Sequence, residues 1–175
     1  MLRSLAFAVL ALSACAPASP ELSPGTRDST LLVNDGTVNI RTSERSVAVD
    51  VPLAAEQAWA ALPAAYEALG LRGGGPAGER LFGVPRMEAS RALNGVRLSR
   101  YLDCGATVSV PNADSYAVTL QVSTRLTPVT GSSTRVETLV QGTARPRDTS
   151  GNPVACTSTG ALERQIAEKL RPAGP

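Results

Sequence analysis

Three cysteines and the absence of histidine limit the chemistry that this 175-residue chain can carry. Without histidine the chain lacks the commonest general base and metal ligand, so a serine or cysteine nucleophile has no usual activating partner. The acidic residues that fall in expected loops or near strand ends show no spacing that groups them into a catalytic pair: Glu79, Glu88, Asp103 and Asp114. We therefore expect no enzyme activity, no metal and no cofactor.

The composition is that of a folded domain without a strong charge bias. The 17 basic and 15 acidic residues nearly balance, and no block of like charge offers the electrostatic footprint of a nucleic-acid-binding protein. A hydrophobic content of 43% is enough to form a core, which argues against disorder throughout the chain. The length fits one domain of ordinary size with tails.

The first fifteen residues have the features of an export signal. Arg3 supplies a positive charge, an apolar run covers residues 5–12, and small residues follow it. The run is too short to span a bilayer, which needs about 20 residues, and it fits a secretory signal instead. An ordinary signal peptide would be cut after Ala14 or Ala16 and would leave Cys15 without a special role.

The sequence Leu12-Ser13-Ala14-Cys15 resembles the lipobox of bacterial lipoproteins, which has an aliphatic residue, two small residues and then cysteine. The resemblance implies that the Cys15 thiol receives a diacylglycerol, that the preceding segment is removed and that the new amine is acylated. Two or three acyl chains, at ~0.8 kcal/mol per buried CH₂, form an effectively permanent membrane anchor. In proteobacterial lipoproteins an aspartate after the cysteine favours the inner membrane. This chain has Ala16, so the resemblance implies the periplasmic face of the outer membrane.

We expect three segments along the chain. Residues 1–14 form a signal peptide, residues 15–29 a lipidated N-terminus with a flexible tether, and residues 30–175 a single α+β domain. The tether is rich in proline and has little to bury, and its mean reach is about 20 Å. It would space the domain from the membrane surface.

With Cys15 set aside, Cys104 and Cys156 remain for pairing. An exported domain lies in an oxidising compartment, where paired cysteines form disulfides. A loop of about 52 residues closed in this way contributes ~4 kcal/mol in the chain-entropy model. The alternative is a redox or metal pair, but the chain has no CxxC motif and no histidine, and two thiols alone do not make a tetrahedral zinc site.

Two helices are predicted, one on each side of a strand-rich middle. After a strand at residues 46–51, the segment 53–70 places apolar residues at helical spacing, and Gly70 is a good C-terminal stop. This stripe consists of Ala55, Trp59, Leu62, Tyr66 and Leu69. A C-terminal helix capped by Thr159 or Gly160 has the stripe Leu162, Ile166 and Leu170.

Alternation of apolar and polar residues predicts antiparallel strands. Asp35-Gly36 is a hairpin signal within residues 29–41. The clearest signal covers residues 115–128, where a turn at residues 130–133 leads into a second strand of the same period. One face of this long hairpin should be buried, and its first strand would contribute Tyr116, Val118, Leu120 and Val122.

The middle of the chain has weaker signals. We expect, in order, a loop at residues 72–79, short strands at 80–84 and 86–93, a turn at Asn94-Gly95, and a segment at 96–105 that fits either strand or helix.

These elements predict an α+β fold in which an antiparallel curved sheet packs against a long helix and a C-terminal helix. By pattern, residues 46–171 are similar to helix-grip domains. With the anchor, their element order also resembles the C-terminal domains of BamC-type outer-membrane assembly lipoproteins. Both resemblances rest on element order alone and imply a fold, because no diagnostic motif accompanies them.

The expected function is that of a binding or scaffolding lipoprotein held at the membrane, with an envelope protein complex or peptidoglycan as partner and no nucleic acid. Arg97, Arg100 and Tyr101 are candidates for its contact surface. The alternative is a carrier of an apolar small molecule in a cavity between sheet and helix, lined by Trp59 and Tyr66.

Overall fold

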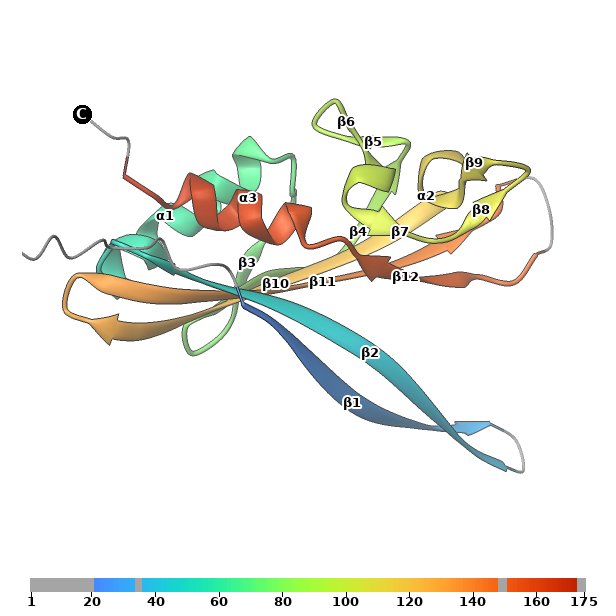
Figure 1. The fold of residues 1–175 in the computed structure, drawn as a ribbon, viewed down its shortest axis with the longest axis horizontal. Helices are drawn as coiled ribbons and strands as arrows, with labels where there is room; N and C mark the ends of the chain where they lie inside the picture. Colours follow the sequence, from blue (N-terminus) through green and yellow to red (C-terminus); the bar gives the residue numbers. More distant parts are fainter. Residues whose placement is uncertain (1–20, 34–35, 148–150, 173–175) are drawn as a thin grey trace, which may run out of the picture.

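The computed structural model describes residues 21–33, 36–147 and 151–172, with side chains described from residue 46 onward. It is a mixed α+β structure with an antiparallel sheet and a few helices, as the sequence predicts (Figure 1). Among the described residues no helix is long and apolar enough to cross a membrane.

The main sheet is built around the hairpin of β10 (Ala117–Thr130) and β11 (Ser133–Arg145). Its strand order is β1-β2-β11-β10-β4-β5-β6. The other strands of this path are β1 (Glu21–Val33), β2 (Gly36–Val51), β4 (Leu81–Ser90), β5 (Ala92–Leu93) and β6 (Val96–Arg97). Three short strands attach to it: β3 (Gly75–Gly78) on β4, β12 (Val154–Ser158) on β11, and β7 (Leu102–Asp103) on β12. A separate pair consists of β8 (Ala106–Thr107) and β9 (Val110–Pro111).

The helices are α1 (Ala55–Ala68), the 3₁₀ turn η1 (Leu98–Arg100), α2 (Asn112–Ser115) and α3 (Ala161–Lys169). Figure 1 shows α1 and α3 together on one side of the sheet. With 14 residues α1 has an ordinary length for a globular protein, so the expected long helix is not found.

Helix α1 ends where the sequence predicts. Gly70 has a φ of +78°, which glycine adopts without steric penalty. The Gly70 amide donates to the Glu67 carbonyl and the Leu71 amide to the Tyr66 carbonyl, both at 2.9 Å. This pair of bonds is a Schellman motif, and it turns the chain back toward the sheet. Of the predicted stripe, Leu62, Tyr66 and Leu69 are buried, whereas Ala55 and Trp59 are half-buried.

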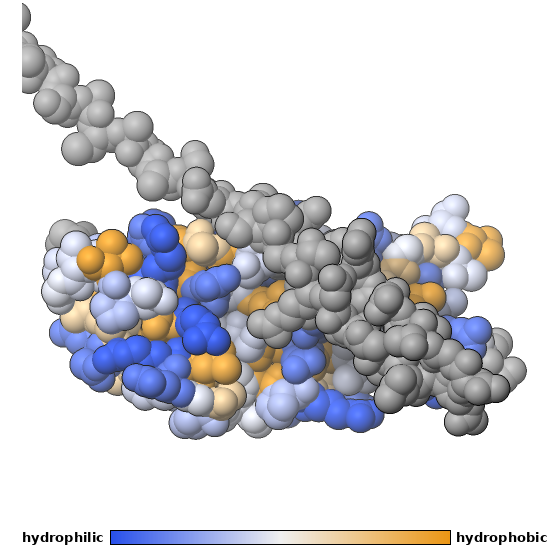
Figure 2. Space-filling model, turned by 90° about the horizontal axis from the view of Figure 1, so that it is seen from below, coloured by the Kyte–Doolittle hydropathy of each residue, from blue (hydrophilic) through white to orange (hydrophobic). Residues whose placement is uncertain are grey.

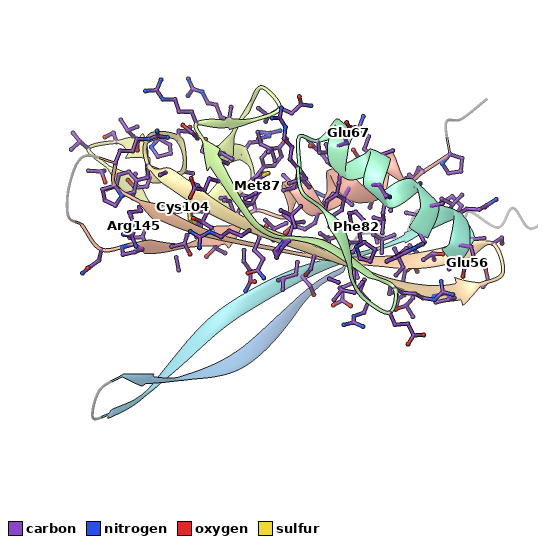
Figure 3. All side chains as sticks on the ribbon, turned by 180° about the vertical axis from the view of Figure 1, so that it is seen from behind. Glu56, Glu67, Phe82, Met87, Cys104 and Arg145 are labelled. Carbon is purple, nitrogen blue, oxygen red and sulfur yellow. A yellow bond between two sulfur atoms is a disulfide. The ribbon has the colours of Figure 1, made fainter. Side chains whose placement is uncertain are left out.

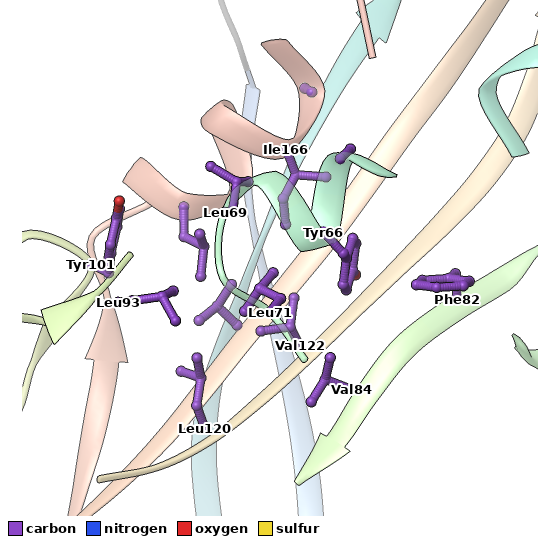
Figure 4. Close-up of a cluster of buried hydrophobic side chains, with 14 of the residues drawn as sticks. Tyr66, Leu69, Leu71, Phe82, Val84, Leu93, Tyr101, Leu120, Val122 and Ile166 are labelled. Carbon is purple, nitrogen blue, oxygen red and sulfur yellow. The ribbon is translucent and has the colours of Figure 1, made fainter. Parts of the chain in front are cut away.

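The long hairpin confirms the predicted alternation. Val118, Leu120 and Val122 are buried, and the residues between them are exposed or half-buried. Tyr116, just before β10, is half-buried. Leu162, Ile166 and Leu170 of the C-terminal segment are buried as well, so α3 packs with its predicted stripe inward. Figure 4 shows Ile166 of α3 beside Tyr66 and Leu69 in the apolar cluster that covers the sheet.

The structure corrects the tether. Residues 21–29, predicted as flexible, belong to β1, which pairs with β2 from Glu21 opposite Ala48 to Val33 opposite Gly36. Residues 15–20, including Cys15, lie outside the described residues. The hairpin signal near Asp35-Gly36 was correct, but its strands extend further than predicted. Because β1 ends the strand order, Pro24 can lie in it without removing a donor that an inner strand requires.

Strand β4 replaces the two short strands predicted on either side of Pro85. Val84 pairs with Val122 and Met87 with Leu120, so β4 has one residue more than β10 between these pairs. Such a bulge accommodates a proline, which lacks an amide donor for the ladder. The predicted loop before it contains β3 at residues 75–78.

Candidate functional site

Cys104 and Cys156 form a disulfide with an S–S distance of 2.04 Å. The bond joins the bend after β7 to strand β12 across 52 residues of sequence, and Figure 3 shows it near one end of the sheet. This is the pairing that the cysteine count predicts. It leaves neither of the two thiols free for redox chemistry or metal binding.

Tyr66 is a core residue, with a side chain only 1% exposed. Its hydroxyl lies 2.8 Å from Thr124 Oγ1, which in turn lies 2.9 Å from Thr138 Oγ1, so a buried hydrogen-bonded chain links α1 to the central hairpin. Burial raises the pKa of Tyr66 to about 12, although the hydrogen bond to Thr124 acts in the opposite direction. The raised pKa and the hydrogen bond both follow from the position of Tyr66 in the core, and neither indicates a reactive group.

Trp59 and Tyr66, predicted to line a ligand cavity, both pack against Phe82. Each meets Phe82 edge to face, with ring centroids 6.1 Å and 5.0 Å apart, respectively, so the aromatic rings pack on one another. The hollow that Tyr66 borders measures about 320 Å³ and lies at the surface, beside the exposed residues Pro63 and Arg72. Trp59 does not line it. The two rings predicted as cavity lining are therefore part of the aromatic packing around Phe82.

The four acidic residues considered for catalysis do not come together into a site. Asp114 accepts hydrogen bonds from the Ser99 amide at 2.8 Å and hydroxyl at 2.7 Å, and Asp103 accepts one from the Gly105 amide at 2.9 Å. Glu79 and Glu88 are exposed. The described residues contain no group of three or more His, Cys, Asp or Glu that could hold a metal ion.

Glu163 is a buried carboxyl that the sequence reasoning missed. It lies in the first turn of α3, is 1% exposed, and accepts a hydrogen bond from the Ser158 hydroxyl. Its second oxygen has no hydrogen-bond partner among the described residues. Burial raises the pKa of Glu163 above its usual range. Its place three residues after Gly160 is typical of a glutamate that caps a helix, but here the Gly160 amide donates to Ser158 Oγ and Glu163 accepts from the Ser158 hydroxyl instead.

Of the three residues predicted for a contact surface, Arg97 and Arg100 are exposed, whereas Tyr101 is buried. Tyr101 is 3% exposed, and its hydroxyl donates to Gln165 Oε1 at 3.0 Å. Arg91 is also exposed, and it comes directly before Ala92, which pairs with Arg97. All three arginines are exposed and make no ion pair with another described residue. We call Arg91, Arg97 and Arg100 the arginine face.

A groove of about 430 Å³ lies near the β5–β6 turn, and Arg91, Arg97 and Arg100 are not among its lining residues. It runs between the end of α1, the β5–β6 turn and α3, and the Tyr101–Gln165 hydrogen bond lies along it. Asn94 Nδ2 donates to the Ala68 carbonyl at 2.8 Å and so joins two of these elements. The polar lining residues include Asn94, Gln165, Glu168 and Lys169. The groove can offer hydrogen bonds to a polar ligand, and the exposed guanidinium groups of the arginine face can offer paired hydrogen bonds to an anionic one.

No protein-family model, curated protein or solved structure matches this chain, and therefore no relative assigns a role to any of these residues.

Proposed function

We propose that the chain is a lipid-anchored protein of the bacterial cell envelope whose folded domain binds another envelope component. The observation that carries the proposal is the distribution of its cysteines. Cys104 and Cys156 are bonded to each other, and Cys15 stands at the end of a lipobox-like export signal. A chain acylated at Cys15 and folded in an oxidising compartment would have this distribution. Ala16 supports the periplasmic face of the outer membrane as its location.

The proposed partner is a carboxylate-bearing component of the envelope, either the peptide of peptidoglycan or an acidic surface of a protein complex. Support comes from the arginine face, where three guanidinium groups are exposed without an ion-pair partner among the described residues. A planar guanidinium binds a carboxylate through two parallel hydrogen bonds, which gives both affinity and orientation. In this proposal the curved sheet with α1 and α3 on one face is a rigid support for that surface.

The anchor is tested by substituting Cys15→Ala and growing cells with a fatty-acid analogue. We expect the variant to lose labelling and to move to the soluble fraction after cell lysis. The matched control is the double variant Cys104→Ser/Cys156→Ser, which should stay labelled because it keeps the lipobox cysteine. Unchanged membrane association of Cys15→Ala would contradict the anchor.

The contact surface is tested by crosslinking in the native envelope. The triple variant Arg91→Gln/Arg97→Gln/Arg100→Gln should lose the crosslinked partner that the parent captures. Arg125→Gln is the matched control, because Arg125 is also exposed but lies on β10, away from the arginine face. Equal capture by the triple variant and the control would show that the partner binds elsewhere.

A further inference from the structure

The β8–β9 hairpin carries a valine in an unfavourable backbone conformation. Thr107 pairs with Val110, and the two residues between them, Val108 and Ser109, have φ values of +48° and +66°. A two-residue turn with both φ values positive is the type that asparagine and glycine favour. A positive φ in a β-branched residue is a genuine outlier, and such strain often accompanies function.

The same turn exposes apolar surface. Val108 is 91% exposed and Val110 49%, and no other large hydrophobic residue with a described side chain is as exposed as Val108. The segment 105–111, with sequence Gly-Ala-Thr-Val-Ser-Val-Pro, contains no charged residue. Figure 2, seen from below, shows apolar side chains at the surface of the end of the molecule that holds β8, β9 and β12 in Figure 1. We call Val108 and Val110 the valine tip.

The valine tip is held firmly at its base. Asn112 is buried, and its Nδ2 donates to the Cys104 carbonyl at 3.0 Å while its Oδ1 accepts from Thr107 Oγ1 at 2.7 Å. Thr107 Oγ1 also lies 3.0 Å from the hydroxyl of Tyr116, and the disulfide fixes Cys104 itself. The exposure of the valines is therefore a property of an ordered hairpin.

We propose that the valine tip inserts into the interfacial region of an anionic lipid bilayer. Uncharged β-branched side chains at a narrow tip can enter the boundary between headgroups and acyl chains without burying a charge. A protein partner is less well matched, because interface hot spots favour tryptophan, tyrosine and arginine and under-represent valine. The inference rests on the proposed function in one respect: two valines bind weakly, and the lipid anchor keeps the domain at the membrane.

Cationic residues at the same end of the sheet suit anionic headgroups. Arg145 pairs with Ala117 on β10 and is exposed, and Figure 3 places it at the end of the sheet that also holds Cys104. Arg147 is exposed and donates to the carbonyls of Ser115 and Tyr116, at 3.2 Å and 3.3 Å, beside the base of the hairpin. Basic groups near an apolar contact strengthen binding to anionic lipid.

Depth-dependent fluorescence quenching tests the insertion directly. The full chain, processed and purified from the envelope, is incorporated into phosphatidylglycerol–phosphatidylcholine vesicles whose acyl chains carry bromine, which quenches tryptophan. In a Trp59→Phe background, Val108→Trp reports on the valine tip. Val129→Trp is the matched control, because Val129 is 49% exposed and lies at the opposite end of β10. We expect blue-shifted emission and several-fold stronger quenching at position 108 than at position 129, and weaker quenching when the vesicles are phosphatidylcholine alone.

Equal quenching at positions 108 and 129, with emission typical of water-exposed tryptophan, would overturn the proposal. So would capture of position 108 by a protein partner without any quenching by lipid. The mass of the purified chain shows separately whether Cys15 is acylated. Quenching at position 108 in a chain that lacks acyl groups would refute the lipid anchor and support insertion of the valine tip. An acylated chain without quenching at position 108 would support the anchor and refute insertion.

Discussion

Two turns in this molecule share one backbone conformation and differ in the residues that adopt it. Asn94 and Gly95 have φ values of +47° and +81°, and Val108 and Ser109 have φ values of +48° and +66°. Each pair connects two short antiparallel strands through a two-residue loop. The first turn has the residue types that this conformation favours, whereas the second has a β-branched residue where one is disfavoured.

The comparison shows two ways to hold the same turn. At Asn94-Gly95 the local sequence suffices, and the Asn94 side chain adds a hydrogen bond to the Ala68 carbonyl. At Val108 the local preference opposes the turn, so the conformation depends on contacts at its base, above all Asn112 and the Cys104–Cys156 disulfide. The second turn keeps two exposed valines at a cost in stability, which is the reason to look for a function in it.

Removing the support of the second turn should have the largest effect. The double variant Cys104→Ser/Cys156→Ser should lose about 2–4 kcal/mol of unfolding free energy, because the open chain gains conformational entropy. Urea denaturation measures the loss. Hydrogen exchange should then rise in residues 105–111 and stay unchanged at Asn94-Gly95. Equal protection of both turns would show that the disulfide does not support the second one.

The buried amide of Asn112 should matter next. Asn112→Ala leaves the Cys104 carbonyl and the Thr107 hydroxyl without this partner, and we expect a loss of about 1–3 kcal/mol. The control is Asn152→Ala, at an exposed position. The prediction is checked by the urea midpoints of both variants. A loss as small as that of the control would show that Asn112 does not stabilise the second turn.

The first turn offers the converse experiment. Gly95→Val places a β-branched residue at a positive φ, and nothing lies within 4 Å of the added Cβ, so any loss comes from the backbone. We expect a loss of about 1–2 kcal/mol. Gly131→Val is the matched control, since Gly131 is also in a hairpin turn with open space but without a positive φ. Similar losses in the two variants would argue against backbone strain as the cause.

The two turns also show how far the sequence could predict this molecule. Asn94-Gly95 was recognisable because its residue types are specific to a turn, and so was Gly70 at the end of α1. The stripes of the helices and the alternation in the β10–β11 hairpin were predictable because one face of each element is buried. Val108-Ser109 could not be predicted, since its conformation comes from tertiary contacts that oppose the local preference.

Other differences have the same origin. Residues 21–29 were predicted as part of a tether because residues 16–29 contain three prolines and few residues to bury, but they pair with β2 as an outer strand. The sequence predicted two short strands on either side of Pro85 where the structure has the single strand β4, because a bulge cannot be recognised from residue types alone. In the candidate site, the exposure of Arg97 and Arg100 followed from their charge, whereas the burial of Tyr101 depends on Gln165 of a distant helix.

The experiment with the smallest expected effect is the most direct test of the central claim. The claim is that tertiary contacts hold the second turn in a backbone conformation that valine disfavours. The measurement is the melting temperature of Val108→Asn/Ser109→Gly compared with that of the parent. Because asparagine and glycine accept a positive φ, we expect a gain of about 1 kcal/mol, which raises the melting temperature by about 2–8 °C. An unchanged or lower melting temperature would contradict the account, because the turn would then carry no strain for a function to explain.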